Sequence, residues 1–161
     1  RIRGEICGYG EASDAEHIVR PQAEGQAQAI RNALADAGMA PADIGWIVSH
    51  GTGTVLNDRT ESAAIRSIWG APGPATPPVS ALKSYVGHTI GASGAVEMAM
   101  ALLALERGRL PPNLNAEPTD PECGIRLVGR QPEPLLNPVV VKQSFGFGGA
   151  NGVMVARRYE A

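Results

Sequence analysis

Residues 90–105 constrain the fold more than any other part of the chain. Only Ser93 and Glu97 interrupt a run that otherwise consists of glycine and apolar residues. A helix that is apolar nearly all round is buried on more than one side. A sheet covers one side of such a helix, so we expect a second layer on the other side, and that layer need not belong to this chain. The longest uninterrupted apolar tract, residues 98–105, is far too short to cross a membrane.

Predicted strands and helices alternate along the 161 residues, a length that suits one domain. The predicted strands are residues 2–9, 44–49, 79–81, 125–128, 139–143 and 153–158. The predicted helices are residues 21–37, 58–69 and 91–107. Asp58 and Glu61 resemble a capping box at the start of the second helix. This β-α-β-α-β-α-β-β order predicts an α/β fold, in which helices flank a mixed, mostly parallel sheet with a terminal hairpin.

The composition argues against several classes of function. The formal net charge is -2, from 14 basic and 16 acidic residues, and no block of like charges suggests a nucleic-acid binder. Cys7 and Cys123 are too isolated for a disulfide framework or a zinc site. We recognise no signal peptide and expect a cytoplasmic protein. The chain begins at Arg1 without Met, which we interpret as the place where another half was separated.

Polar groups follow three of the predicted strands at their carboxyl ends. His50 comes directly after strand 44–49, and Lys83 and His88 lie in the loop after strand 79–81. A glycine-rich segment, residues 145–151, follows the strand predicted at residues 139–143. In open α/β sheets, ligands bind outside the carboxyl ends of the strands. We therefore expect these groups to meet at one edge of the sheet.

Each of these groups also has an explanation that involves no chemistry. A single histidine such as His50 is more often structural than catalytic, and His17 has no partner motif. Lys83 alone is typical of a surface position. Residues 146–151 could form only a hairpin turn, and the threonines of residues 50–54 could cap the next helix. No two histidines have metal-ligand spacing. The shared sheet edge nevertheless favours a functional site.

Three motifs together resemble a known family. They are His50-Gly51-Thr52-Gly53-Thr54 with Asn57, Asp58 and Glu61; Lys83 and His88 with Gly91-Ala92-Ser93-Gly94; and Ser144-Phe145-Gly146-Phe147-Gly148-Gly149-Ala150-Asn151. In this order and spacing they are similar to the second half of the β-ketoacyl synthases, the condensing enzymes of type II fatty acid and polyketide synthesis. The resemblance extends from about residue 2 to residue 159.

The resemblance implies a divided active site. Members have a duplicated thiolase-like architecture, in which two similar halves pack helices between their sheets, so residues 1–161 would be the C-terminal half. The nucleophilic cysteine belongs to the N-terminal half, which is absent from this chain. Neither Cys7 nor Cys123 lies in the strand-to-helix elbow that this nucleophile occupies. We therefore expect the chain alone to be inactive in condensation.

The resemblance also implies a reaction, the decarboxylative Claisen condensation of an acyl thioester with malonyl-acyl carrier protein. His50 and His88 would hold the malonyl thioester carbonyl and stabilise the enolate that forms when carbon dioxide leaves. Lys83 would be the structural and electrostatic lysine of the family. It would pair with Glu97, which explains an acidic residue on an otherwise apolar helix.

Other matching residues would handle the carrier-bound substrate. Thr52 and Thr54 would hydrogen-bond the phosphopantetheine arm. Phe147 would be the gating residue, and its backbone N–H would complete the oxyanion hole. It lies in a loop that consists of Phe145, Gly146, Phe147, Gly148 and Gly149. The expected partners are acyl carrier protein, the complementary N-terminal half and, once complete, a second copy. No cofactor, metal ion, nucleic acid or membrane is expected.

Two other interpretations stay open. The chain could belong to a non-catalytic partner subunit, like the chain-length-determining partners of some polyketide synthases, although those typically lose the histidines that match His50 and His88. A thiolase or another coenzyme A enzyme of the same fold fits less well. Thiolases carry a second cysteine near the glycine-rich loop, where this chain has Phe145 and Phe147.

Overall fold

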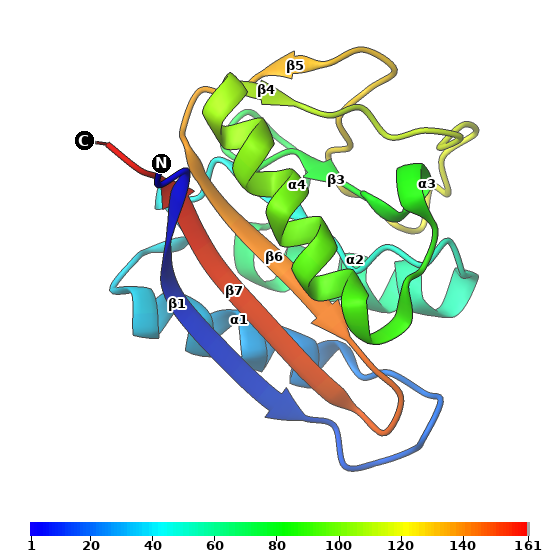
Figure 1. Cartoon of the computed structure of the whole chain (residues 1–161). Helices are drawn as coiled ribbons and strands as arrows, with labels where there is room; N and C mark the ends of the chain where they lie inside the picture. Colours follow the sequence, from blue (N-terminus) through cyan, green and yellow to red (C-terminus); the bar gives the residue numbers. More distant parts are fainter. Residues whose placement is uncertain (161) are drawn as a thin grey trace.

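A five-stranded sheet, in the order β1-β7-β6-β2-β3, forms the centre of the computed structural model, which describes residues 1–160 (Figure 1). Its strands are Gly4–Ser13 (β1), Trp46–Val48 (β2), Val79–Ser80 (β3), Val139–Phe145 (β6) and Ala150–Arg158 (β7). The helices are Ala23–Ala37 (α1), Val55–Trp69 (α2), Lys83–Val86 (α3) and Ser93–Arg107 (α4), with 3-10 turns at Pro41–Asp43 and Ile90–Ala92. Two short strands, Arg109–Leu110 (β4) and Glu133–Pro134 (β5), pair separately.

The sheet is mixed because two kinds of connection join its strands. Strand β2 is parallel to β3 and to β6, and helices lie in both crossovers. Strand β7 is antiparallel to β6 and to β1, and a short glycine-rich turn joins β6 to β7. The predicted mixed sheet with a terminal hairpin is confirmed, but the expectation of a mostly parallel sheet is wrong. The carboxyl ends of β2, β3 and β6 share one edge.

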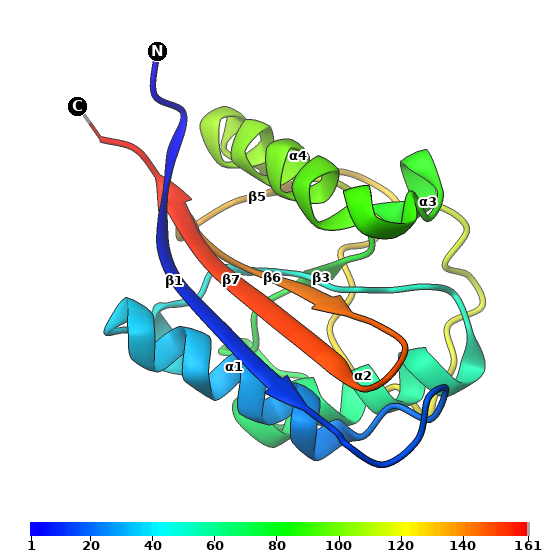
Figure 2. The same ribbon diagram turned by 60° about the horizontal axis from the view of Figure 1, so that its bottom comes forward.

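The helices divide over the two faces of the sheet. Figure 2 shows α1 and α2 on one face and α4 on the other. Successive residues of β6 reflect this division, because Val141 packs with α1 and α2 whereas Val140 packs with α4. Two apolar clusters result, one on each face. The α/β architecture predicted from the alternation of elements is therefore confirmed.

Helix α4 is covered on only one of its sides. It buries Glu97, Met98, Ala101 and Leu105 toward the sheet, whereas Leu103 on the other side is 38% exposed. The second layer that the apolar sequence predicts is not formed by residues 1–160. No helix of this described part of the chain has the length and apolar character needed to cross a membrane.

The edge strand β1 is covered by polar side chains of α1. A side chain at Gly8 would meet the backbone of α1 at 2.6 Å, so glycine allows the helix to approach closely. The N–H of Tyr9 donates to Asp36 Oδ2 at 2.8 Å, and Asn32 Nδ2 donates to the Glu11 carbonyl at 2.9 Å. These bonds satisfy backbone groups that an edge strand otherwise leaves open to another chain.

The start of α2 differs from the prediction. The helix begins at Val55 instead of Asp58, and Thr54 is its N-cap. The Thr54 hydroxyl accepts a hydrogen bond from the Asn57 N–H at 3.3 Å, which satisfies one of the free donors of the first turn. The capping box of Asp58 and Glu61 is therefore wrong, and Glu61 is free for another contact.

The strand predicted at residues 125–128 is also wrong. This segment contributes one isolated bridge, between Val79 and Leu127. The side chain of Asn113 explains why no longer ladder forms, because its Nδ2 donates to the carbonyls of Val79 and Val128 at 2.8 and 2.9 Å. A side-chain amide thus holds the two segments together where further backbone pairing was expected.

Candidate active site

His50 and His88 lie side by side at the carboxyl edge of the sheet. His50 follows β2, and His88 lies between α3 and α4. Their ring centroids are 5.4 Å apart and their planes are inclined by 85°, so one ring presents its edge to the other. His50 is buried and His88 is exposed. The structure thus brings the two predicted histidines together from separate loops.

The contacts of His88 indicate which of its nitrogens carries the proton. Its Nδ1 accepts a hydrogen bond from the N–H of Ile90 at 3.1 Å and lies 3.0 Å from the Ser93 hydroxyl. In the neutral ring the proton is therefore on Nε2. The Nε2–H of His88 is left as a donor for a bound group.

His50 is held in its neutral form. Burial, and after it the positive charges of Lys83 and Lys142 and the nearby His88, lowers the pKa of its imidazole from 6.5 to about 3. Its Nδ1 is buried without a hydrogen-bond partner. Phe145 contacts the same ring edge to face at a centroid distance of 5.9 Å. The site therefore contains an uncharged imidazole that is largely shielded from water.

A buried carboxylate connects two lysines near His50. Glu97 of α4 pairs with Lys83 at 2.7 Å and with Lys142 of β6 at 2.8 Å, one lysine at each carboxylate oxygen. Lys83 also donates to the backbone carbonyl of His50. The structure thus contains the expected Lys83–Glu97 pair. Lys142 was not predicted as part of the site, although a lysine within the apolar run of β6 is the pattern of a paired buried charge.

Glu61 holds the backbone that carries His50. Its carboxylate accepts the N–H of His50 at 2.6 Å and the N–H of Gly51 at 2.9 Å. Asn57 Nδ2 donates to the same carboxylate at 3.2 Å. Burial raises the pKa of Glu61, although these three hydrogen bonds act to lower it. This role was also missed, because the spacing from Asp58 suggested a cap.

Thr52 and Thr54 lie at the start of α2, shortly after His50 in the sequence. Their hydroxyl oxygens are 3.0 Å apart. Thr54 is exposed and caps the helix, whereas Thr52 is half-buried and lines a cavity. The simpler explanation, that a threonine of this motif caps the next helix, is thus confirmed for Thr54. Both hydroxyls keep a lone pair or proton for a further partner.

The glycine-rich loop places its two phenylalanines differently. Phe145 ends β6 and is buried against His50, whereas Phe147 is 84% exposed and points away from the core. Gly148 and Gly149 have φ angles of 81° and 76°, which only glycine adopts without strain. Residues 14–18 hold the loop, because the Asp14 N–H donates to the Gly149 carbonyl at 2.9 Å and the Gly148 N–H donates to the Ile18 carbonyl at 2.8 Å.

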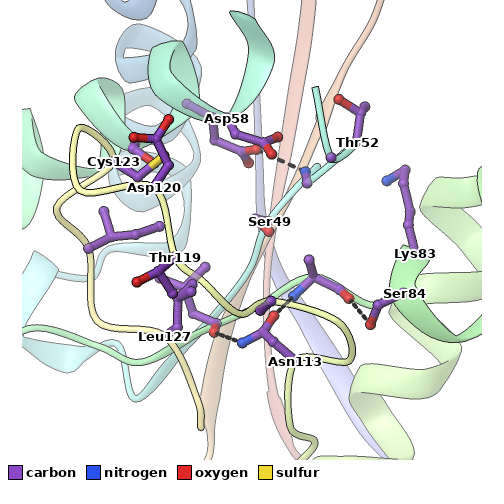
Figure 3. Close-up of a pocket in the computed structure, with 18 of the residues that line it drawn as sticks. Ser49, Thr52, Asp58, Lys83, Ser84, Asn113, Thr119, Asp120, Cys123 and Leu127 are labelled. Atoms are coloured by element: carbon purple, nitrogen blue, oxygen red, sulfur yellow. Dashed lines mark hydrogen bonds between the residues drawn. The ribbon is translucent and has the colours of Figure 1, made fainter. Parts of the chain in front are cut away.

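A cavity of about 830 Å³ opens next to these residues. Figure 3 shows Thr52 and Lys83 near one end and Cys123 near the other. Asn113 fixes the wall between them, because its Oδ1 accepts the Ala81 N–H at 2.7 Å while its Nδ2 binds two carbonyls. His88 also lines the cavity, so its imidazole borders a large open volume.

Neither cysteine lies in a nucleophilic setting. Cys7 lies at a β-bulge in strand β1, and burial raises the pKa of its thiol. Cys123 lies in a turn and lines the far end of the cavity, so it does not occupy a strand-to-helix elbow. Among residues 1–160, no group of three or more His, Cys, Asp or Glu side chains is arranged to hold a metal ion.

The fold and the site define the class of this protein. It forms one half of a thiolase-like fold, in which two histidines, a Lys–Glu pair and a glycine-rich loop meet at one sheet edge. The chain belongs to the β-ketoacyl synthase family, because residues 3–117 match the family described as Beta-ketoacyl synthase, C-terminal domain. One curated relative is the 3-oxoacyl-[acyl-carrier-protein] synthase 2 of Synechocystis sp., which is 38% identical over 162 residues.

Solved structures agree with this assignment. The ishigamide ketosynthase/chain length factor superimposes with a TM-score of 0.94 at 39% identity, over 99% of this chain and 39% of that chain. AntDE:AntF, a type II polyketide synthase acyl-carrier protein in complex with its ketosynthase, gives a TM-score of 0.91 at 30% identity, over 99% of this chain and 40% of that chain. The Synechocystis match likewise covers 99% of this chain and 39% of the relative, so the chain spans about two fifths of its relatives' length.

Proposed function

We propose that this chain supplies the His/His/Lys half of the active site of a 3-oxoacyl-acyl carrier protein synthase. Such an acyltransferase joins an acyl thioester to malonyl-acyl carrier protein with loss of carbon dioxide. The observation that carries the proposal is the pair of His50 and His88, whose rings meet edge to face at 5.4 Å beside a large cavity. The names of the curated relatives describe the same activity.

The proposed chemistry uses the histidines as donors. Decarboxylation breaks the bond between the malonyl carboxylate and its methylene carbon, and the electron pair moves onto the thioester oxygen as an enolate. Each N–H donor aimed at this oxygen contributes roughly 3–4 kcal/mol. His50 suits this role because it stays neutral, and His88 because its Nε2–H is free. The enolate carbon then attacks the acyl thioester, and the cysteine thiolate of the complementary half leaves.

The loops around the histidines fit a carrier-bound substrate. We propose that Thr52 and Thr54, whose hydroxyls are 3.0 Å apart, hydrogen-bond the phosphopantetheine arm. Phe147, exposed on a glycine-rich loop, would gate the entrance and supply its backbone N–H to the oxyanion hole. Acyl carrier protein is the proposed partner, and the complex described for AntDE:AntF supports this choice.

The uncovered side of α4 is the proposed contact with the complementary N-terminal half. Leu103 on this side is 38% exposed, an unfavourable setting for a helix of this composition alone in water. The nucleophilic cysteine would come from that half, and the completed enzyme would be a cytoplasmic dimer. The proposal involves no cofactor, because imidazole, ammonium and thiolate groups supply all the chemistry.

Complementation tests this proposal directly. The chain alone is expected to release no carbon dioxide from malonyl-acyl carrier protein and to form no condensation product. Addition of a cysteine-bearing N-terminal half is expected to restore both, and the same mixture with His50→Ala is expected to lose decarboxylation. Condensation by the isolated chain would overturn the division of the active site, and full activity of the His50→Ala mixture would overturn the role of His50.

The same experiment distinguishes the proposed function from the interpretation of the chain as part of a non-catalytic partner subunit. A chain-length-determining partner would need no functional histidines, and His50→Ala would then leave the assembled enzyme unchanged. The presence and packing of both His50 and His88 favour the catalytic interpretation over this scaffold role.

A further inference from the structure

Ser93 is a buried serine at the start of α4, and its hydroxyl contacts the ring of His88. The residue is 4% exposed, and its Oγ lies 3.0 Å from His88 Nδ1 and 3.2 Å from the Thr89 hydroxyl. Buried hydroxyl groups are nearly always hydrogen-bonded, so these contacts satisfy a group that would otherwise be costly to bury. The proposed chemistry gives Ser93 no role, because it uses the Nε2–H on the other side of the ring.

The backbone determines the direction of the hydrogen bond between Ser93 and His88. The N–H of Ile90 donates to His88 Nδ1 at 3.1 Å, so this nitrogen is an acceptor. The Ser93 hydroxyl therefore donates to Nδ1 as well, and its oxygen is left to accept from the Thr89 hydroxyl. Two donors thus meet at one nitrogen, and they keep the proton of the neutral ring on Nε2.

The Ile90 N–H alone is a weak anchor for this ring, because it comes from a strained turn. Ile90 has a φ angle of 53°, a left-handed conformation that is unfavourable for a β-branched residue. Its side chain is 78% exposed, so packing within residues 1–160 does not compensate for this strain. His88 is exposed as well. The direction of its ring therefore depends on hydrogen bonds more than on packing.

His17 has the same backbone contact as His88. It also lies in an exposed loop, and the N–H of Val19, two residues further on, donates to its Nδ1 at 3.2 Å. The contact between His88 and Ile90 has the same spacing and nearly the same length. Within residues 1–160, the Ser93 hydroxyl distinguishes the surroundings of the two Nδ1 atoms. His17 therefore serves as an internal reference for the effect of a backbone donor by itself.

Ser93 shares a buried face of α4 with Glu97. Residues four apart lie one above the other on a helix, and these two side chains are 4% and 0% exposed. Glu97 binds Lys83 at 2.7 Å, and Ser93 contacts His88 at 3.0 Å. The first turns of α4 thus contact both of the groups that the segment after β3 contributes to the site.

We propose that Ser93 is a positioning residue of the condensing site: its hydroxyl donates to His88 Nδ1, so that the ring keeps its proton on Nε2 and presents this N–H to the cavity. The inference rests on the proposed function, in which His88 is a neutral donor to the thioester oxygen. It extends that function to a buried residue that touches neither the substrate nor the reacting atoms.

Ser93→Ala tests the inference, because it removes only the hydroxyl, and alanine is the best helix former. The 161-residue chain is labelled with [¹⁵N]histidine, and its three rings are assigned from His17→Asn, His50→Asn and His88→Asn spectra. At about pH 8, the ring ¹⁵N shifts report the ratio of the two neutral tautomers. In the wild type, we expect this ratio to favour Nε2–H more strongly in His88 than in His17.

The variant is expected to remove this difference. In Ser93→Ala, the ratio of Nε2–H to Nδ1–H in His88 should fall about fivefold, toward the value of His17, since one neutral hydrogen bond is typically worth such a factor. Ser67→Ala is the control and should leave every ring unchanged, because the Ser67 hydroxyl bonds the Ala64 carbonyl. An unchanged His88 ratio in Ser93→Ala, or equal ratios for the two histidines in the wild type, would overturn the inference.

An activity measurement connects the inference to the proposed function. In the assembled enzyme, Ser93→Ala is expected to lower kcat for malonyl decarboxylation about twofold to fivefold, with KM changed less than about twofold. An unchanged kcat would contradict the positioning role. If the wild-type assembly is inactive but the ¹⁵N ratios change as expected, the proposed function fails and the hydrogen bond from Ser93 to His88 stands.

Discussion

Lys83 Nζ lies 2.7 Å from Glu97 Oε1 and donates at the same time to the backbone carbonyl of His50. The ion pair thus connects helix α4 to His50, two residues beyond strand β2. Both side chains are buried, with 5% and 0% exposure. Loss of either partner leaves a charge in the protein interior, which is far more destabilising than loss of a surface pair.

Glu97→Gln is therefore expected to lower the free energy of unfolding by about 3–5 kcal/mol, because both Lys83 and Lys142 lose their counter-ion. Urea denaturation followed by the fluorescence of the buried Trp46 measures this change. Glu106→Gln is the matched control on the same helix, since Glu106 pairs with Arg1 and Arg3 at the surface. It should cost no more than about 1 kcal/mol. Equal effects would contradict a buried role for Glu97.

The neutral state of His50 predicts how stability depends on pH. The pKa of His50 is about 3 in the folded chain against 6.5 when unperturbed, so the unfolded state takes up a proton first as the pH falls. The contribution of His50 to the free energy of unfolding is fully present above pH 6.5. It declines by roughly 1.4 kcal/mol per pH unit between pH 6.5 and about pH 3. Urea titrations at a series of pH values should show this slope in the wild type.

His50→Asn isolates this contribution, because asparagine does not titrate. The difference in unfolding free energy between wild type and variant is expected to narrow or change sign as the pH falls below 6.5. His17→Asn is the control, since His17 lies in an exposed loop. A pH-independent difference for His50→Asn would show that the folded imidazole takes up its proton as easily as the unfolded one.

Much of this architecture could be predicted from the sequence, because periodicity determines which elements form. The apolar run of α4 and the strand ends at His50 and Lys83 indicated both the layers and the edge where the groups meet. The number of parallel neighbours could not be predicted, because strand order depends on long-range pairing. The need for another layer over α4 could be predicted because this helix is apolar nearly all round, whereas one sheet covers only one side of a helix.

The missed contacts share a physical cause. Lys142 and Glu61 act through partners distant in sequence, and only the register of β6 and the rotation of α2 determine where they point. The two phenylalanines illustrate the same limit. Phe145 belongs to the strand and lies on the same buried face as Val141, whereas Phe147 lies beyond the strand and follows the loop.

The two threonines are expected to separate stability from substrate binding. Thr54→Ala removes the N-cap of α2, so it should lower the unfolding free energy by about 1 kcal/mol. Thr52→Val removes a hydroxyl that is not a cap, so stability should change by no more than about 0.5 kcal/mol. In the assembled enzyme, both variants should raise KM for malonyl-acyl carrier protein. An unchanged KM for Thr52→Val would exclude its proposed contact with the phosphopantetheine arm.

Gly10 of β1 provides a final prediction on the packing that supports the sheet. A side chain there would overlap the backbone of Ala29 and Ala33 in α1, and helix backbone cannot rotate away as a flexible side chain does. Gly10→Ala is therefore expected to lower the unfolding free energy by about 1–3 kcal/mol. Gly129→Ala is the control, because a side chain at Gly129 meets nothing within 4 Å. It should be neutral or stabilising by up to about 1 kcal/mol, since alanine restricts the unfolded chain. Similar values for the two variants would mean that α1 does not pack against β1 as closely as the structure has it.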